Sequence, residues 1–223
     1  MHAEEARQVA EDLPSALGQA LVGASARKER GEGAGRLHQT IVGPLTSGKT
    51  TLAQDYAMAL SELGLVKKEG FITIHYFEQL DRDQLEARFE GAKGGVIIID
   101  DITRHVENAS DLHPLTSYLW RALASDDTTV ILTGYKDKME EFAASAPPEK
   151  RALLPTPVEL EKSFSFEERQ AFTNPNEARR KARLEKRKVA EEWENALDIT
   201  LKTGKGVALP KKATFGKKEQ PKS

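Results

Sequence analysis

Residues 43–51 have the types and the spacing to hold a phosphate group. In order they are Gly43, Pro44, Leu45, Thr46, Ser47, Gly48, Lys49, Thr50 and Thr51. They fit the pattern G-x-x-x-x-G-K-[ST], in which the two glycines let the backbone curl and point its N–H groups at phosphate oxygens. Lys49 adds a positive charge for the outer phosphates, Thr50 offers a hydroxyl to a magnesium ion, and Thr51 can support the innermost phosphate. An ordinary turn rich in glycine and serine is the alternative interpretation.

Two adjacent carboxylates, Asp100 and Asp101, follow the apolar run at residues 96–99. A buried strand there would place Asp100 at the carboxyl edge of a sheet, where ligands bind in parallel α/β folds. Asp100 is then the carboxylate on the magnesium side, acting with Thr50 either directly or through a water molecule. Asp101 would orient or deprotonate an attacking water. Acidic residues often end strands, so the pair gains its meaning from the phosphate loop, and together the two motifs predict binding of ATP with Mg²⁺.

The segments around these motifs alternate between apolar strands and helices. Strands are predicted at residues 38–43, 71–77, 94–101 and 128–135, with a fifth near 158–160. Helices are predicted at residues 49–65, 84–92, 112–124 and 136–145. Strands that are apolar on both faces and alternate with helices are typical of a parallel sheet covered on both sides. The sequence therefore predicts an α/β fold of the P-loop NTPase class, with a doubly wound parallel sheet in a core at residues 37–165.

Extensions are predicted on both sides of this core. Residues 1–36 read as a helix at 3–22, which Pro14 should kink or restart, followed by a glycine-containing linker at 24–36. Residues 166–198 form a charged helical segment, with its main helix at 177–198, and residues 199–223 form a basic flexible tail. The fold thus carries helical extensions at its N- and C-terminal ends.

Composition excludes several classes of chemistry. The chain of 223 residues has no cysteine, which rules out disulfides, iron–sulfur clusters and thiol nucleophiles. Its apolar runs are far shorter than the roughly 20 residues of a membrane span, and the N-terminal stretch is too acidic for a signal peptide, so we expect a cytoplasmic protein without a membrane partner. Residues 174–223 carry 14 Lys and Arg against 7 Asp and Glu, whereas residues 1–173 carry 19 against 28. The basic end could contact nucleic acid or an acidic surface, although a solvated basic face is the preferred interpretation.

The motifs and their order resemble an AAA+ ATPase, and within that group the CbbX/SpoVK-like, rubisco-activase-type branch. The resemblance is carried by residues 36–66, 69–74, 90–101 and 128–142. It implies ATP binding, hydrolysis coupled to movement of subunits, and a homo-oligomer, commonly a hexameric ring. By position, Lys49 and Thr50 match the Walker A residues of the family, Asp100 matches the Walker B aspartate, and Thr133 falls near its sensor-1 position.

The chain departs from the family pattern at several positions. Asp101 stands where the family usually has glutamate, and its side chain is one methylene shorter, which predicts slow hydrolysis. Residues 75–84 lack the glycine and aromatic pattern of the family's substrate-gripping loop. Arg151 is the candidate arginine finger. Further arginines, considered for a second sensor but better explained by a solvated helix face, are Arg179, Arg180 and Arg183.

Three functional hypotheses remain open at this stage. The first is an AAA+-type ATPase that couples binding and hydrolysis of Mg-ATP to conformational change or oligomer assembly. The second is a hydrolysis-poor, nucleotide-dependent switch or adaptor that binds an unknown protein partner through its basic C-terminal region. The third is a small-molecule P-loop kinase, which the phosphate loop alone would permit.

Overall fold

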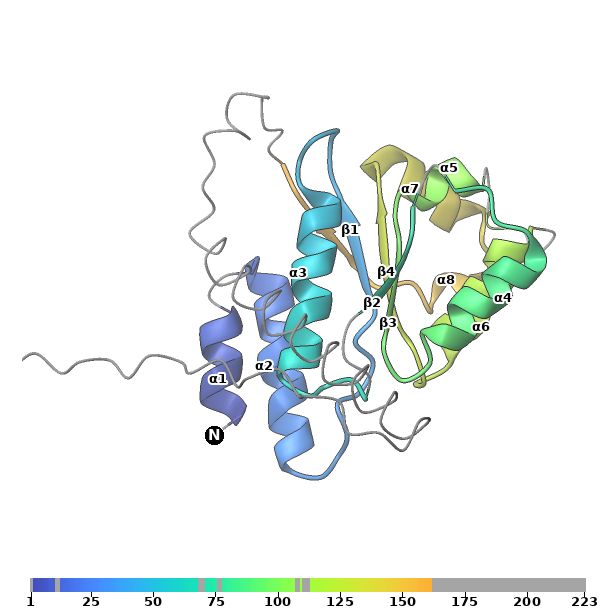
Figure 1. The fold of residues 1–223 in the computed structure, drawn as a ribbon. Helices are drawn as coiled ribbons and strands as arrows, with labels where there is room; N and C mark the ends of the chain where they lie inside the picture. Colours follow the sequence, from blue (N-terminus) through green and yellow to red (C-terminus); the bar gives the residue numbers. More distant parts are fainter. Residues whose placement is uncertain are drawn as a thin grey trace, which may run out of the picture. The chain divides into compact units, whose positions relative to one another are not determined.

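The computed structural model describes residues 2–161 apart from residues 11, 12, 68–70, 76, 77, 107, 108 and 110–112. All described residues belong to one unit, residues 1–171 (Figure 1). The predicted segments 166–198 and 199–223, the helix at 177–198 within them, and the arginines considered for a second sensor lie outside the described residues.

Helices and strands alternate along the described chain. The helices are α1 (His2–Ala10), α2 (Ser15–Glu29), α3 (Lys49–Glu62), α4 (Arg82–Gly91), α5 (Ile102–His105), α6 (Pro114–Ala124), α7 (Lys136–Ser145) and α8 (Pro148–Arg151). The strands are β1 (Gln39–Val42), β2 (Phe71–Ile74), β3 (Val96–Ile99), β4 (Thr129–Gly134) and β5 (Pro157–Glu159). The predicted order of elements is confirmed, and the short helices α5 and α8 are additions that the sequence did not predict. No helix among these described segments is long and apolar enough to cross a membrane.

The five strands form one parallel sheet in the order β2-β3-β4-β1-β5. This arrangement confirms the predicted doubly wound α/β fold. Strand β4 lies between β1 and β3, so the carboxyl ends of these three strands meet at one edge of the sheet. The register pairs Ile99 with Leu132, which brings the following residues, Asp100 and Thr133, side by side. The two predicted motifs therefore meet through the strand between them.

Both faces of the sheet are buried, and neighbouring residues of a strand belong to different clusters. In β3, Val96 and Ile98 pack with α1, α2 and α3, whereas Ile97 and Ile99 pack with the cluster formed by α4, α6 and α7. Figure 1 shows the two sets of helices on opposite faces of the sheet. This burial explains why β3 reads as a continuous apolar run rather than an alternating one. The strand is shorter than the predicted run 94–101, because Gly94 and Asp101, both at positive φ, bound it.

The N-terminal helices differ in part from their prediction. The restart at Pro14 is confirmed, since Pro14 occupies the N-cap position of α2. The linker predicted at residues 24–36 is wrong over its first six residues, because α2 continues to Glu29. Ala24 and Ser25 are buried there, and the Arg27 guanidinium donates hydrogen bonds of 3.2 and 2.7 Å to the Ala34 carbonyl. Packing of the helix and this side-chain contact with the loop that follows it override the charged, glycine-containing composition.

The packing of α2 on the domain predicts a large effect for Leu21→Ala. The Leu21 side chain is fully buried in the cluster that also holds α3 residues. We expect its truncation to lower the free energy of unfolding by about 2–5 kcal/mol, since both transfer and cavity terms are lost. Gln19→Ala, an exposed position on the same helix, is the control and should change stability by no more than about 0.5 kcal/mol. Urea denaturation of both variants measures the difference; equal stabilities would contradict the role of α2 as part of the domain.

Candidate functional site

The predicted phosphate-binding loop connects β1 to α3, as the motif requires. Gly48 is the N-cap of α3 and has φ of 86°, and Thr46 is also left-handed at φ of 64°. Gly43 is required for a different reason: a Cβ atom there would lie 2.7 Å from the Leu160 carbonyl oxygen and 2.8 Å from Ser47 Oγ. Gly48 therefore permits a backbone conformation that other residues rarely adopt, and Gly43 permits a close approach of two chain segments.

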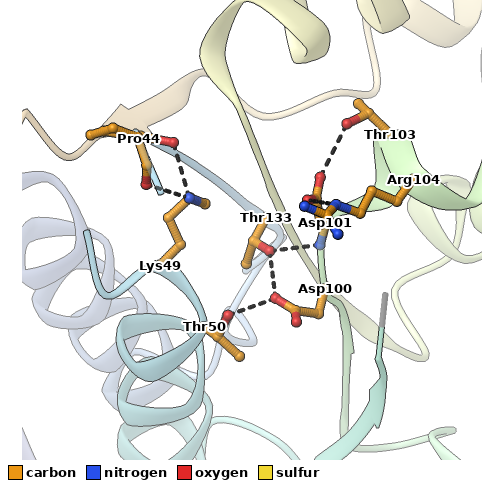
Figure 2. A network of polar contacts seen from close by, with 9 residues as sticks. Pro44, Lys49, Thr50, Asp100, Asp101, Thr103, Arg104 and Thr133 are labelled. Carbon is orange, nitrogen blue, oxygen red and sulfur yellow. Dashed lines mark hydrogen bonds and ion pairs between the residues drawn. The ribbon is translucent and has the colours of Figure 1, made fainter. Parts of the chain in front are cut away.

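The Lys49 side chain, at the first position of α3, folds back onto the preceding loop. Its ammonium donates hydrogen bonds to the carbonyl oxygens of Gly43 at 3.0 Å and Pro44 at 2.7 Å (Figure 2). It also lies 4.8 Å from the centre of the Tyr135 ring. Partial burial lowers the pKa of Lys49, while the carboxylates of Asp101 and Asp100 act in the opposite direction. The positive charge is thus held inside the loop and within range of both aspartates.

Asp100 joins three elements through one carboxylate oxygen. Its Oδ1 accepts a hydrogen bond of 2.6 Å from the Thr50 hydroxyl at the start of α3 and one of 2.9 Å from the Thr133 hydroxyl on β4. The carboxylate belongs to a residue that is only 7% exposed. The Asp100 backbone N–H donates to the Ile74 carbonyl at 2.9 Å, which continues the ladder of β2 and β3 by one residue. The structure therefore brings together the two residues predicted for the metal and the predicted sensor-1 threonine.

Asp101 lies beside this group, but its carboxylate is held elsewhere. Its backbone N–H donates to Thr133 Oγ1 at 2.9 Å. One carboxylate oxygen accepts from the Thr103 hydroxyl at 3.1 Å, and the other pairs with Arg104 Nε at 2.9 Å. Neither Thr103 nor Arg104 is among the site residues predicted from the sequence. The signal that could have revealed the ion pair is the spacing of three residues from Asp101 to Arg104 at the start of a helix.

Arg151 caps a helix of its own chain. Its guanidinium donates hydrogen bonds to the carbonyl oxygens at the end of α7, at 2.9 Å to Ala143, 2.8 Å to Ala144 and 3.1 Å to Ala146. These contacts supply donors at the C-terminal end of the helix, where carbonyl groups lack intrahelical partners, although the Ala143 carbonyl also accepts from the Ala146 N–H at 3.2 Å. They do not include the phosphate loop or the two aspartates. The predicted role as an arginine finger toward a neighbouring subunit stays a prediction.

Thr50 and Asp100 fit a magnesium ion by chemistry, since magnesium prefers oxygen ligands and retains several waters. Their oxygens lie 2.6 Å apart, close enough to share one cation. Within the described ranges, no group of three or more His, Asp or Glu side chains could hold a metal ion without help. Magnesium in proteins is commonly bound by one or two carboxylates together with substrate phosphates and water.

The sheet order, with the phosphate loop between β1 and α3 and the paired aspartates after β3, defines a P-loop NTPase fold of the AAA+ type. No protein-family model matches the chain. Protein CfxQ of Xanthobacter flavus is 32% identical over 146 residues, covering 57% of this chain and 44% of CfxQ. The chloroplastic ribulose bisphosphate carboxylase/oxygenase activase of Cyanidioschyzon merolae is 32% identical over 128 residues, covering 50% of this chain and 42% of the activase.

The chain is therefore a distant relative of the CfxQ and rubisco-activase AAA+ proteins, as the sequence motifs predicted. It spans less than half the length of these relatives. Among solved structures, a RuvB mutant from Thermotoga maritima aligns with a TM-score of 0.42 and 20% identity, covering 69% of this chain and 47% of RuvB. A likeness at this TM-score does not bear on function.

The position of Thr133 between two aspartates predicts that Thr133→Val destabilises the domain. Valine has the same shape but leaves the Asp101 N–H without an acceptor and removes one donor from Asp100. We expect the free energy of unfolding to fall by about 1–3 kcal/mol, the cost of unsatisfied buried polar groups. Urea denaturation measures this loss.

Thr40→Val is a matched control on the neighbouring strand β1. The Thr40 hydroxyl is buried and has no hydrogen-bond partner among the described residues, so its replacement should be neutral or stabilising. Equal losses in the two variants would show that the hydrogen bonds of Thr133 are not what stabilises this edge of the sheet.

Proposed function

We propose that the chain binds ATP with magnesium in the loop at residues 43–51. The observation that carries this proposal is the meeting of Lys49, Thr50 and Asp100 at the carboxyl edge of the sheet, beside a loop whose glycines have the required geometry. The N-terminus of α3 adds the positive end of a helix dipole to the same place. An anion with several oxygens and an associated divalent cation suits this combination of groups.

Each residue of the site has a role in this proposal. The Lys49 ammonium would exchange the carbonyl oxygens of Gly43 and Pro44 for oxygens of the outer phosphates. The Thr50 hydroxyl would offer its oxygen to the cation, and Asp100 would contribute its carboxylate directly or through a water molecule. Magnesium, when bound, supplies neutralisation of the phosphate charge and fixes its orientation. Thr133 would keep the Asp100 carboxylate in place, and Thr51 would support the innermost phosphate.

Binding would be coupled to slow hydrolysis, and through it to conformational change or assembly. Asp101 is the residue that would orient or deprotonate water, but its short carboxylate is bonded to Thr103 and Arg104. That engagement favours the second candidate function, a hydrolysis-poor switch that binds nucleotide and uses its basic C-terminal region to hold a protein partner. A homo-oligomer, hexameric by family resemblance, and a cytoplasmic location belong to the same proposal.

Lys49→Ala tests the binding site directly. Loss of the ammonium removes the charge that the loop directs at the outer phosphates, so we expect Mg-ATP affinity to fall by at least about tenfold, the scale of a charge-assisted hydrogen bond. Isothermal titration calorimetry with Mg-ATP measures the affinity. Lys93→Ala, at an exposed position where the side chain pairs only with Glu90 among the ion pairs of the described residues, is the control and should bind as the unmodified chain does. Equal affinities in both variants would refute binding at residues 43–51.

Assembly gives a second, independent test. If nucleotide binding drives ring formation, mass photometry should show the chain as larger species with Mg-ATP than without it, and Lys49→Ala should abolish the difference. A monomer under both conditions, at concentrations well above the dissociation constant for ATP, would refute the ring and leave the switch as the surviving function.

A further inference from the structure

We propose that Arg104, assisted by Thr103, is a positioning residue that holds the Asp101 carboxylate away from the attacking water and thereby restrains ATP turnover. The inference rests on the proposed function, because it assigns a regulator to the same site. The geometry around Asp101 points to it.

The backbone of Asp101 is held in a conformation that a non-glycine residue adopts at a cost. Its φ of 49° and ψ of 61° lie in the left-handed region. Such a residue persists only where its surroundings fix it. Here Thr133 accepts a hydrogen bond from the Asp101 N–H on one side, and Thr103 and Arg104 bind the two carboxylate oxygens on the other. The position of the carboxylate is thus specified by three contacts.

The two adjacent aspartates are directed differently. Figure 2 shows the Asp100 carboxylate turned toward Thr50 at the phosphate loop and the Asp101 carboxylate turned toward Thr103 and Arg104 in α5. A water at the outer phosphate would have to compete with a hydroxyl and a charged guanidinium for the oxygens of Asp101. Hydrogen bonds between a guanidinium and a carboxylate are stronger than those between neutral groups. The ion pair therefore opposes the role that the second aspartate would have in hydrolysis.

The difference in exposure between the two side chains would let the Arg104 guanidinium move away while the Asp101 carboxylate keeps its position. The Arg104 side chain is 49% exposed, whereas that of Asp101 is 11% exposed. The guanidinium is therefore the more accessible partner of this ion pair. Its departure would leave the Asp101 carboxylate with Thr103 as its remaining side-chain partner in this network.

Arg104→Gln tests the proposal through a split between turnover and binding. We expect the turnover number for Mg-ATP to rise about three- to tenfold, the range for an ion pair between partly and mostly buried groups, with the ATP dissociation constant unchanged. Arg104→Lys keeps the charge and should give a smaller rise. Thr103→Val loses the other side-chain contact and should also raise turnover; it carries the test if Arg104→Gln does not fold, as judged by circular dichroism.

Two controls separate this role from a general effect of removing a charge. Arg36→Gln breaks an exposed pair with Asp126 beside the amino ends of β1 and β4, and should leave turnover as it is. In an Asp101→Asn background, Arg104→Gln should give no gain, because the group that it restrains is gone. A rise that persists in that background, or unchanged or lower turnover in the folded single variants, overturns the proposal. Absence of ATP binding by the unmodified chain would instead refute the proposed function.

Discussion

The candidate site depends on one buried carboxylate oxygen. Oδ1 of Asp100 accepts hydrogen bonds from Thr50 and Thr133, and so connects the start of α3, the end of β3 and the last part of β4. A buried carboxylate without such donors would be costly, whereas with them it fixes the relative positions of the three elements. The phosphate loop is attached to this arrangement by Thr50, which follows Lys49 directly. Asp100 thus serves the fold and the candidate site with the same atom.

Sheet topology makes this interaction available. Because β4 is inserted between β1 and β3, one strand separates the strand that leads to the phosphate loop from the strand that leads to Asp100, and Thr133 on that middle strand donates a hydrogen bond to Asp100. The register decides which residue does so: Ile41 pairs with Thr133, and Leu132 pairs with Ile99. A shift of one residue would turn the hydroxyl to the other face of the sheet. The position of a single threonine therefore depends on the pairing of three strands.

Sequence predicted those features that local pattern specifies. The glycines, Lys49 and Thr50 follow a fixed spacing, and β3 and β4 are apolar throughout because both faces of the sheet are covered. Features that depend on packing and on side-chain contacts were not predicted from the sequence. The extension of α2 to Glu29 relies on burial of Ala24 and on a hydrogen bond from Arg27 to Ala34, and composition alone indicated a linker. Arg151 was a candidate arginine finger although its proline-rich surroundings do not align cleanly with the family, and its contacts with the end of α7 could not be seen in the sequence. The partners of Asp101 also depend on a backbone conformation that no spacing rule predicts.

The contrast between the two aspartates has a consequence for how binding and turnover relate. Asp100 is held by neutral hydroxyl groups, which could remain as ligands or donors beside a cation, so its contacts are compatible with the proposed binding of a metal nucleotide. Asp101 is held by a guanidinium, whose charge competes with whatever else would use that carboxylate. Binding would then depend on an aspartate with neutral hydrogen-bond donors, and hydrolysis on a neighbouring aspartate that is paired with a positive charge. Under the proposed function, such a chain would bind nucleotide without turning it over quickly, and a change in Arg104 alone would alter turnover without altering binding.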